Sequence, residues 1–283
     1  MSMNADKLQS RMGPVALIVR DLDRCVEYYT NIIGLRVRSR MGTVVHLGAG
    51  AEDLLVLEGN SDAPPATHTT GLFHTAFLVP SRAALARHIR HLADSGALID
   101  GMADHAVSEA IYLSDPEGNG IEIYRDRPRE EWAWKDGFVH MVTDPLDAEL
   151  LLQEADREGA KWSGVDAGTI VGHVHLRVSN LIAAEKFYCG ILGFDVTTRS
   201  YRGALFISKN GYHHHLGLNT WRSYNAPPPA TGSAGLKQFV HRTDGTEFDL
   251  IRDRASASEV MIKETAQGIL LRDPFGIHVE ITK

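Results

Sequence analysis

The sequence of 283 residues has few cysteines, no long apolar run and no excess of positive charge. Two cysteines, Cys25 and Cys189, are too few for a disulfide framework, so a reducing cytoplasm is the simplest location. No apolar run reaches the roughly 18 to 20 residues that a membrane span needs, and the start of the chain lacks the apolar core of a signal peptide. Lys and Arg number 29 against 36 Asp and Glu, which argues against a large nucleic-acid surface. These absences predict a cytoplasmic protein with neither membrane nor nucleic acid as a partner.

The rest of the composition is typical of a globular protein. Apolar residues make up 43% of the chain and charged residues 23%, and the length suggests about two domains. Histidine is the residue type that stands out, with 14 copies. The positions of these histidines carry the functional argument, because imidazole is both a metal ligand and an acid–base group near neutral pH.

The chain repeats itself with an offset of 159 residues. Residues 15–37 align without a gap on residues 174–196, so that Tyr29 falls on Tyr188. Each copy begins with alternating apolar residues, continues with an apolar period of 3.6 residues and stops at a glycine. This pattern predicts a strand, an amphipathic helix with a glycine after its end, and a second strand.

A second repeated unit follows each copy of the first. It begins at residues 71–79 and, more weakly, at 235–240, and it ends at residues 111–124 and again at 269–281. Both ends contain Asp-Pro-x-Gly between two apolar runs. Proline presets one turn dihedral and glycine adopts the positive φ, so each run predicts a hairpin.

Four modules result, each predicted to be a strand, a helix and three further strands. They cover about 12–58, 71–126, 170–221 and 235–283. A linker at 127–168, with a helical stretch near 145–159, separates a first half at 1–126 from a second half at 169–283.

Four segments in the right order carry a resemblance to a known family. They are G172-H-V-H-L-R-V-S-N-L181, N210-G-Y-H-H-H-L-G-L-N219, G71-L-F-H-T-A-F77 and Y112-L-S-D-P-E-G-N-G-I-E122. Paired modules of this type resemble the vicinal oxygen chelate superfamily, which includes glyoxalase I, fosfomycin-resistance proteins and extradiol dioxygenases. The chain is most similar to two-domain catechol-2,3-dioxygenase-like members. The resemblance implies an α+β fold of four βαβββ modules that form two cupped eight-stranded barrels, with a divalent metal inside.

The resemblance also implies where metal ligands stand, on the first and last strands of a module. The first-strand positions fall on Pro14, His74, His173 and Gln238 in modules one to four. The last-strand carboxylates are Glu122 in module two and Glu280 in module four. Proline cannot bind a metal, so module one supplies no ligand.

We expect the metal site to consist of His74, His173 and Glu122. Two histidines and one carboxylate with open positions form the facial arrangement of non-haem Fe(II) oxygenases. This set is complete only if modules two and three build one barrel. Sequential pairing would instead gather a glyoxalase-like set of His173, His215, Gln238 and Glu280, so the pairing of modules is left open.

Three further residues match positions with chemical roles in extradiol enzymes. The resemblance implies that His214 is the acid–base histidine and that Tyr112, ten residues before Glu122, contacts the substrate. His105 is the candidate for a further histidine upstream of that tyrosine. His215 and His175 are additional candidates near the metal, either as a ligand or behind one.

Some histidines are expected to have no chemical role. Strand alternation directs His213 away from His214, which predicts a rim position for His213. His88 and His91 fall on the predicted helix of module two, where we expect a solvated face.

These residues predict an extradiol ring-cleaving dioxygenase of aromatic hydrocarbon catabolism. It would use Fe(II), with Mn, Ni and Zn as alternatives, and its partners would be a small aromatic diol and O2. A glyoxalase-like metal-dependent lyase or isomerase and a non-catalytic small-molecule binder are the alternatives. The ring substituent, the identity of the metal and the oligomeric state, including a homo-oligomer, are left open.

Overall fold

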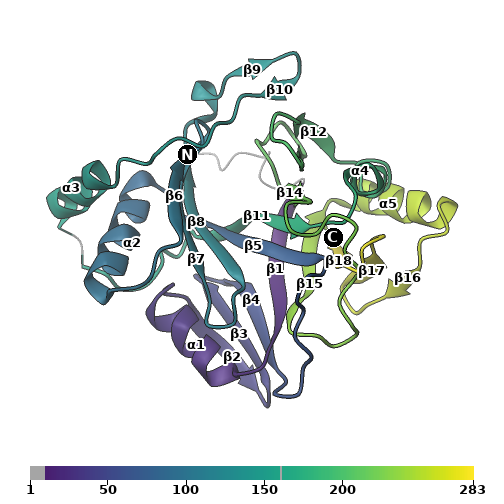
Figure 1. The fold of residues 1–283 in the computed structure, drawn as a ribbon, viewed down its shortest axis with the longest axis horizontal. Helices are drawn as coiled ribbons and strands as arrows, with labels where there is room; N and C mark the ends of the chain where they lie inside the picture. The colour runs from purple at the N-terminus through teal and green to yellow at the C-terminus, as the bar shows by residue number, and fades with distance from the viewer. Residues whose placement is uncertain (1–9, 160) are drawn as a thin grey trace. The chain divides into compact units, whose positions relative to one another are not determined.

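The computed structural model describes residues 10–159 and 161–283, in which four βαβββ modules follow one another as expected (Figure 1). Within this part of the chain no helix is long and apolar enough to cross a membrane. The predicted fold class, an α+β protein built from repeated modules, is confirmed.

The first two modules have the following elements. Module one contains β1 (Ser10–Val19), α1 (Leu22–Asn31), β2 (Arg36–Met41), β3 (Val44–Ala49) and β4 (Glu52–Gly59). Module two contains β5 (Gly71–Leu78), α2 (Arg82–Ser95), β6 (Gly101–Asp104), β7 (Ser108–Ser114) and β8 (Gly120–Asp126).

The last two modules repeat this order. Module three contains β11 (Ile170–Arg177), α4 (Leu181–Tyr188), β12 (Asp195–Thr198), β13 (Ala204–Ser208) and β14 (Leu216–Asn219). Module four contains β15 (Gly235–Thr243), α5 (Gly245–Ala257), β16 (Ile262–Glu264), β17 (Gly268–Arg272) and β18 (His278–Thr282).

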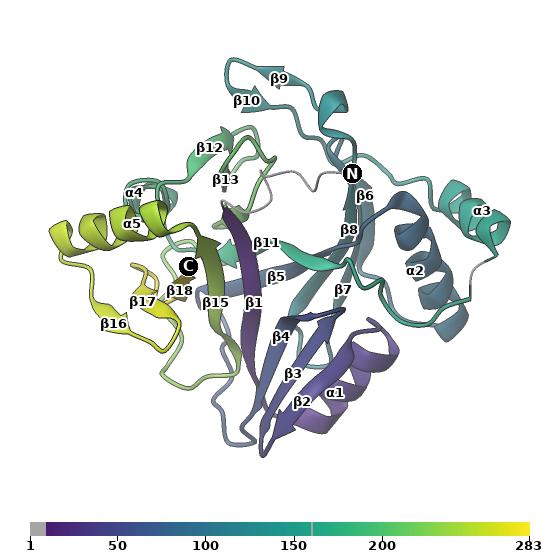
Figure 2. The same cartoon turned by 180° about the vertical axis from the view of Figure 1, so that it is seen from behind.

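The linker has secondary structure of its own. A short 3₁₀ helix (Arg129–Glu131) is followed by a small hairpin of β9 (Trp134–Lys135) and β10 (Phe138–Val139), and then by α3 (Ala148–Glu158). Figures 1 and 2 show α3 beside α2. The division of the chain at residues 126 and 169 stays a prediction.

The strands of the modules form two mixed eight-stranded sheets. Their orders are β16-β17-β18-β15-β1-β4-β3-β2 and β12-β13-β14-β11-β5-β8-β7-β6. In modules two, three and four the first strand runs parallel to the last strand of the same module, whereas the remaining strands pair antiparallel. Every second side chain of a strand projects from the same face of the sheet. Such side chains on the first strand therefore lie beside those on the neighbouring last strand.

Local sequence signals set the ends of the module helices. The side chains of Asp21, Ser81, Asn180 and Asp244 each accept a hydrogen bond from the backbone N–H three residues later. Each thus satisfies one of the N–H groups that the first helical turn leaves without a partner. Gly96 ends α2 in the left-handed conformation at φ +66°, which glycine adopts without a steric cost.

The two Asp-Pro-x-Gly turns have the same construction. One carboxylate oxygen of Asp115 accepts the N–H groups of residues 117 and 119, each at 2.9 Å, and Asp273 accepts those of residues 275 and 277 at 2.8 Å. The other oxygen accepts a hydroxyl from the preceding module, from Tyr29 at 3.1 Å or Tyr188 at 2.8 Å. The turns thereby fix the start of β8 and β18.

The described residues divide into two compact units, each with its own core. One contains 10–18, 63–73 and 172–283, and its core includes Leu176, Phe239 and Ile251. The other contains 19–62 and 74–171, and its core includes Tyr29, Leu57 and Ile123.

The solvated face expected on α2 is wrong for His88. Its side chain is fully buried, and its ring lies 4.9 Å from the ring of Trp162 in a T-shaped arrangement. The His91 ring also stacks on Trp162, with 4.2 Å between the two ring centroids. The pattern failed here because the linker, which follows in sequence, packs against the helix face that looked polar.

Candidate metal centre

Two neighbouring parallel strands, β5 and β8, bring His74 and Glu122 together. His74 pairs with Gly120 and Ala76 with Glu122, so the histidine and the carboxylate project from the same face. His74 Nε2 lies 2.9 Å from Glu122 Oε2, and the two residues are only 6% and 3% exposed. A carboxylate buried this deeply needs a cationic or hydrogen-bonding partner to offset its lost hydration.

Tyr112 extends this face by one strand. It lies opposite Glu122 in the antiparallel pair of β7 and β8, and its ring centroid is 5.7 Å from that of His74. Its hydroxyl lies 2.6 Å from His105 Nε2. The four positions of module two that resemble extradiol enzymes, His74, Glu122, Tyr112 and His105, therefore form one chain of neighbours.

The linker holds His105 in place. His105 Nδ1 lies 2.7 Å from the carbonyl oxygen of Val142, which can only accept a hydrogen bond, so Nδ1 carries the proton. With the proton on Nδ1, Nε2 acts as the acceptor, and the Tyr112 hydroxyl donates to it. Sequence reasoning missed this contact, because a backbone carbonyl 37 residues away leaves no signal in residue types.

The turn that carries His105 is braced by charge. Ala106 adopts a positive φ of +66°, an uncommon conformation for a residue with a side chain. Asp104 accepts the Ala106 N–H at 2.9 Å and an N–H of the Arg127 guanidinium at 2.5 Å. Burial alone would raise the pKa of Asp104, but these hydrogen bonds and the charge of Arg127 outweigh it and lower that pKa. The Asp104 carboxylate thus stays ionised and holds the turn.

His173 and His214 lie together in module three. Their ring centroids are 4.2 Å apart, and His214 Nδ1 lies 2.8 Å from His213 Nδ1. His213 is fully buried, so the rim position expected for it is wrong. The chain is irregular between β13 and β14, and the strand alternation that predicted the rim position does not apply there.

The two additional candidates lie in different surroundings. His215 Nδ1 accepts the N–H of Lys209 at 3.1 Å, and its ring faces Tyr212 at 4.9 Å between centroids. His175 projects from the same face of β11 as His173 and contacts the rings of Phe73 and Phe206. Neither residue belongs to the group of metal-ligating atoms described next.

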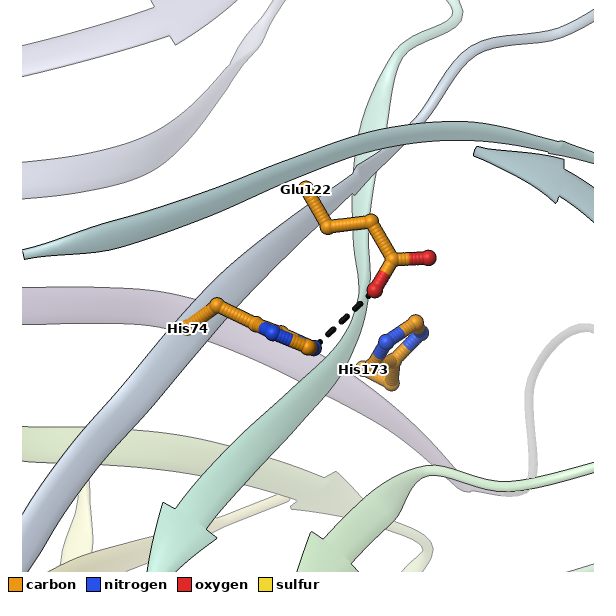
Figure 3. Close-up of side chains that lie close together, drawn as sticks. All are labelled: His74, Glu122 and His173. Atoms are coloured by element: carbon orange, nitrogen blue, oxygen red, sulfur yellow. Dashed lines mark ion pairs between the residues drawn. The ribbon is translucent and has the colours of Figure 1, made fainter. Parts of the chain in front are cut away.

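His74, Glu122 and His173 form one buried group of candidate ligands. One ligand atom from each lies within 4.8 Å of those of the other two (Figure 3). Figure 3 shows both imidazole rings and the carboxylate directed toward one another. Within residues 10–159 and 161–283 this is the one group of three or more His, Cys, Asp or Glu side chains arranged in this way.

The repeated halves of the chain match a known family model. The model of the Glyoxalase/Bleomycin resistance protein/Dioxygenase superfamily matches residues 11–123 and again residues 170–281. The chain belongs to this superfamily. Membership accounts for the repeated modules.

Two curated relatives are dioxygenases by name. The chain is 42% identical over 272 residues to catechol-2,3-dioxygenase of Bacillus subtilis (strain 168), covering 94% of each protein. It is 26% identical to biphenyl-2,3-diol 1,2-dioxygenase 3 of Rhodococcus globerulus, over 54% of this chain and 85% of that protein. Among solved structures, glyoxalase I from Zea mays matches with a TM-score of 0.60 at 17% identity, over 97% of this chain and 92% of that one. At this identity the last match shows the shared superfamily fold alone.

Proposed function

We propose that this protein is an extradiol ring-cleaving dioxygenase that acts on a catechol-type diol with O2. The observation that carries the proposal is the buried group of two histidines and one carboxylate, His74, His173 and Glu122. It occurs in a chain that is 42% identical, over 94% of its length, to a catechol-2,3-dioxygenase. We infer that the cofactor is Fe(II) and that the protein works in a reducing cytoplasm, where Cys25 and Cys189 remain thiols.

The residues present fit a divalent transition metal. Imidazole nitrogens and one carboxylate oxygen suit iron and its neighbours, whereas magnesium and calcium prefer oxygen ligands alone. A cation would also compensate the buried Glu122 carboxylate, which is 3% exposed. His74, His173 and Glu122 would hold the metal, and three protein ligands leave coordination positions for a substrate with two oxygens. The strand order that places β11 and β5 in one sheet supports a metal barrel built from modules two and three.

The bound metal would supply two things, a lowered pKa of the diol hydroxyls and a binding position for O2. The other steps belong to the protein. Tyr112 donates its hydroxyl hydrogen to His105, and a phenolic oxygen is also a hydrogen-bond acceptor. It can therefore accept a hydrogen bond from a substrate hydroxyl and orient the ring.

We assign the transfer of a proton to His214. Its ring lies beside that of His173, and its Nδ1 is engaged with His213 at 2.8 Å. Nε2 is therefore the atom with which His214 would deliver or accept a proton at the substrate. Imidazole is suited to this role because its ordinary pKa lies near neutrality.

The proposal is tested by measuring oxygen uptake after reconstitution with Fe(II) and addition of catechol. Extradiol cleavage breaks the bond between one hydroxyl-bearing carbon and the adjacent ring carbon that bears no hydroxyl. It gives a yellow muconic semialdehyde and consumes one O2 per ring. A muconic diacid product would instead mean cleavage between the hydroxyls. Isomerisation of a hemithioacetal with Ni or Zn would favour a lyase, and protein purified without air that lacks a stoichiometric metal would favour a non-catalytic binder.

A further inference from the structure

One face of β11 continues beyond the candidate metal ligand. Because side chains alternate along a strand, His173, His175 and Arg177 project from the same face. The register with β14 places Gly217 beside His175 and Asn219 beside Arg177. The face therefore passes from a metal ligand to an aromatic region and then to a cationic one.

The middle of this face is aromatic. The His175 ring lies 5.0 Å from Phe73, 5.5 Å from Phe206 and 5.5 Å from Trp221, measured between ring centroids. Gly217 makes room for it, because a Cβ at this position would come within 2.7 Å of the His175 ring. These flat side chains suit contact with the hydrocarbon part of an aromatic ligand.

The far end of the face carries hydrogen-bond donors without acceptors. Asn219 is fully buried, and its Nδ2 has no hydrogen-bond partner among the described residues. Its Oδ1 already accepts the backbone N–H of Trp221, so the amide orientation is fixed with the NH2 group free. Nε of the cross-strand neighbour Arg177 is also buried and without a partner in this part of the chain.

No carboxylate neutralises this end within residues 10–159 and 161–283. Neither Arg177 nor Arg222 forms an ion pair there, and Arg222 is exposed three residues after Asn219. Burial lowers the pKa of Arg177, and the charge of Arg222 lowers it further. Buried donors normally have partners, so donors and like charges that meet without an acceptor indicate a ligand that supplies one.

We propose that Arg177, Asn219 and Arg222 bind a carboxylate carried on the side chain of the diol substrate. This inference rests on the proposed ring-cleaving function and specifies its substrate class. Four residues of strand separate His173 from Arg177, about 13 Å at the usual rise. That offset is longer than one aromatic ring, so the carboxylate stands on a side chain of several atoms. The rings of His175 and Trp221 contact the hydrocarbon portion between the diol ring and the carboxylate.

The test compares an acid with its neutral counterpart of equal length. The probes are 3-(3,4-dihydroxyphenyl)propanoate and the corresponding propanamide, with oxygen uptake by the Fe(II)-loaded protein at constant ionic strength. We expect kcat/KM to favour the acid by about 10- to 100-fold, as for a hydrogen-bonded charge pair. In Arg177→Gln this ratio should fall to near one, in Arg222→Gln it should fall partly, and in Arg177→Lys part of it should return.

The matched control is Arg252→Gln, an arginine on α5 that pairs with Glu264 and lies outside the proposed site. It should keep the wild-type ratio. A wild-type ratio near one, or a high ratio that survives in Arg177→Gln, overturns the proposal. Because each ratio compares two substrates on one variant, partial loss of folded protein does not change it.

A binding measurement separates this inference from the proposed function. Calorimetry of the metal-free protein with 3-phenylpropanoate, which has no diol, should show a Kd that weakens about tenfold in Arg177→Gln. If neither diol is cleaved but this binding difference holds, ring cleavage fails and the anion site stands. If inorganic phosphate alone binds as tightly as 3-phenylpropanoate, the site takes free anions and the substrate assignment is overturned.

Discussion

Modules two and four carry different side chains at the same strand positions. In module two, β5 and β8 present His74 and Glu122, whose facing atoms are 2.9 Å apart. In module four, β15 and β18 present Gln238 and Glu280, and Gln238 Nε2 donates to Glu280 Oε2 at 2.9 Å. The strand registers match, because Tyr112 lies opposite Glu122 and Leu270 lies opposite Glu280.

The difference lies in how each carboxylate is compensated. Glu280 is half-buried, and Thr265 donates to its second oxygen at 2.7 Å, so neutral donors satisfy both oxygens. Glu122 is buried beside an imidazole whose nitrogen is also a candidate metal ligand. A glutamine amide offers an N–H donor and no strong ligand nitrogen, so one substitution turns a candidate metal site into a closed hydrogen-bonded pair.

Module one reinforces the contrast. The position that corresponds to His173 is Pro14, which lies between the paired residues Met12 and Val15, where the register of β1 on β15 shifts. Proline has no N–H for the ladder and is tolerated at such irregularities. In the sheet that contains β1 and β15, Pro14 thus stands at the position of His173. Gln238 and Glu280 stand at the positions of His74 and Glu122.

The largest effect should follow from making module two resemble module four. We expect His74→Gln to remove stoichiometric iron and to lower ring cleavage by more than about 100-fold, since even residues behind metal ligands can matter this much. Iron content and oxygen uptake measure the two effects. The reverse variant, Gln238→His, should bind no second iron because Pro14 stands at the third position. Full iron occupancy in His74→Gln would falsify the ligand assignment.

A narrower effect, on turnover without loss of iron, is expected from a residue that is not itself a candidate ligand. Replacing His214 with Phe should leave iron bound and slow turnover by about 100- to 10,000-fold, the usual contribution of a general acid or base. Metal analysis measures whether iron stays bound, and single-turnover kinetics measures how far the chemical step is slowed. Unchanged ring cleavage would remove the proton-transfer role proposed for His214.

Tyr112 and Leu270 allow a paired test of substrate orientation. Tyr112→Phe removes one hydrogen bond to the substrate and should lower kcat/KM by about 10- to 100-fold with iron retained. Leu270→Phe, at the matching position of module four, should have no effect on kcat/KM. The assignment fails if the two variants behave alike.

The sequence was sufficient to predict the modules and to name three residues that the structure brings together as candidate ligands. Strand and helix periods, the glycine stops and the Asp-Pro-x-Gly turns are local signals, and all four βαβββ modules occur where they were expected. His74, Glu122 and His173 could be named because ligands must be of a few residue types at fixed strand positions. Their roles stay proposals until a metal is measured.

The contacts that reasoning from the sequence did not predict depend on packing between distant segments. The Val142 carbonyl that holds His105 is a backbone atom, and Asn219 is an unremarkable strand residue until its register with Arg177 is known. His88 shows the converse error, since a polar helix position became buried only because Trp162 covers it. Such features require three-dimensional contacts, which periodicity does not contain.

The smallest expected effect compares the two Asp-Pro-x-Gly turns through their pH dependence. Burial raises the pKa of Asp273 to about 6, above its ordinary value of 3.8. Burial also raises the pKa of Asp115, but the side-chain amide of Asn119 donates an additional hydrogen bond to that carboxylate and opposes the rise. A raised carboxyl pKa means that the folded state takes up the proton first, so this group favours folding more as the pH falls below 6. Between pH 7 and pH 5 the free energy of unfolding of the parent protein should therefore rise by about 1 kcal/mol relative to Asp273→Asn.

Asp115→Asn is the matched variant, because its turn and tyrosine partner have the same construction. Urea denaturation of the metal-free proteins at both pH values would measure the differences, and a smaller change is expected for Asp115→Asn. Equal pH dependence in the two variants would mean that both turns bury their carboxyl group to the same degree. The comparison of modules two and four would then be confined to the ligand positions, because the turns that start β8 and β18 would be electrostatically equivalent.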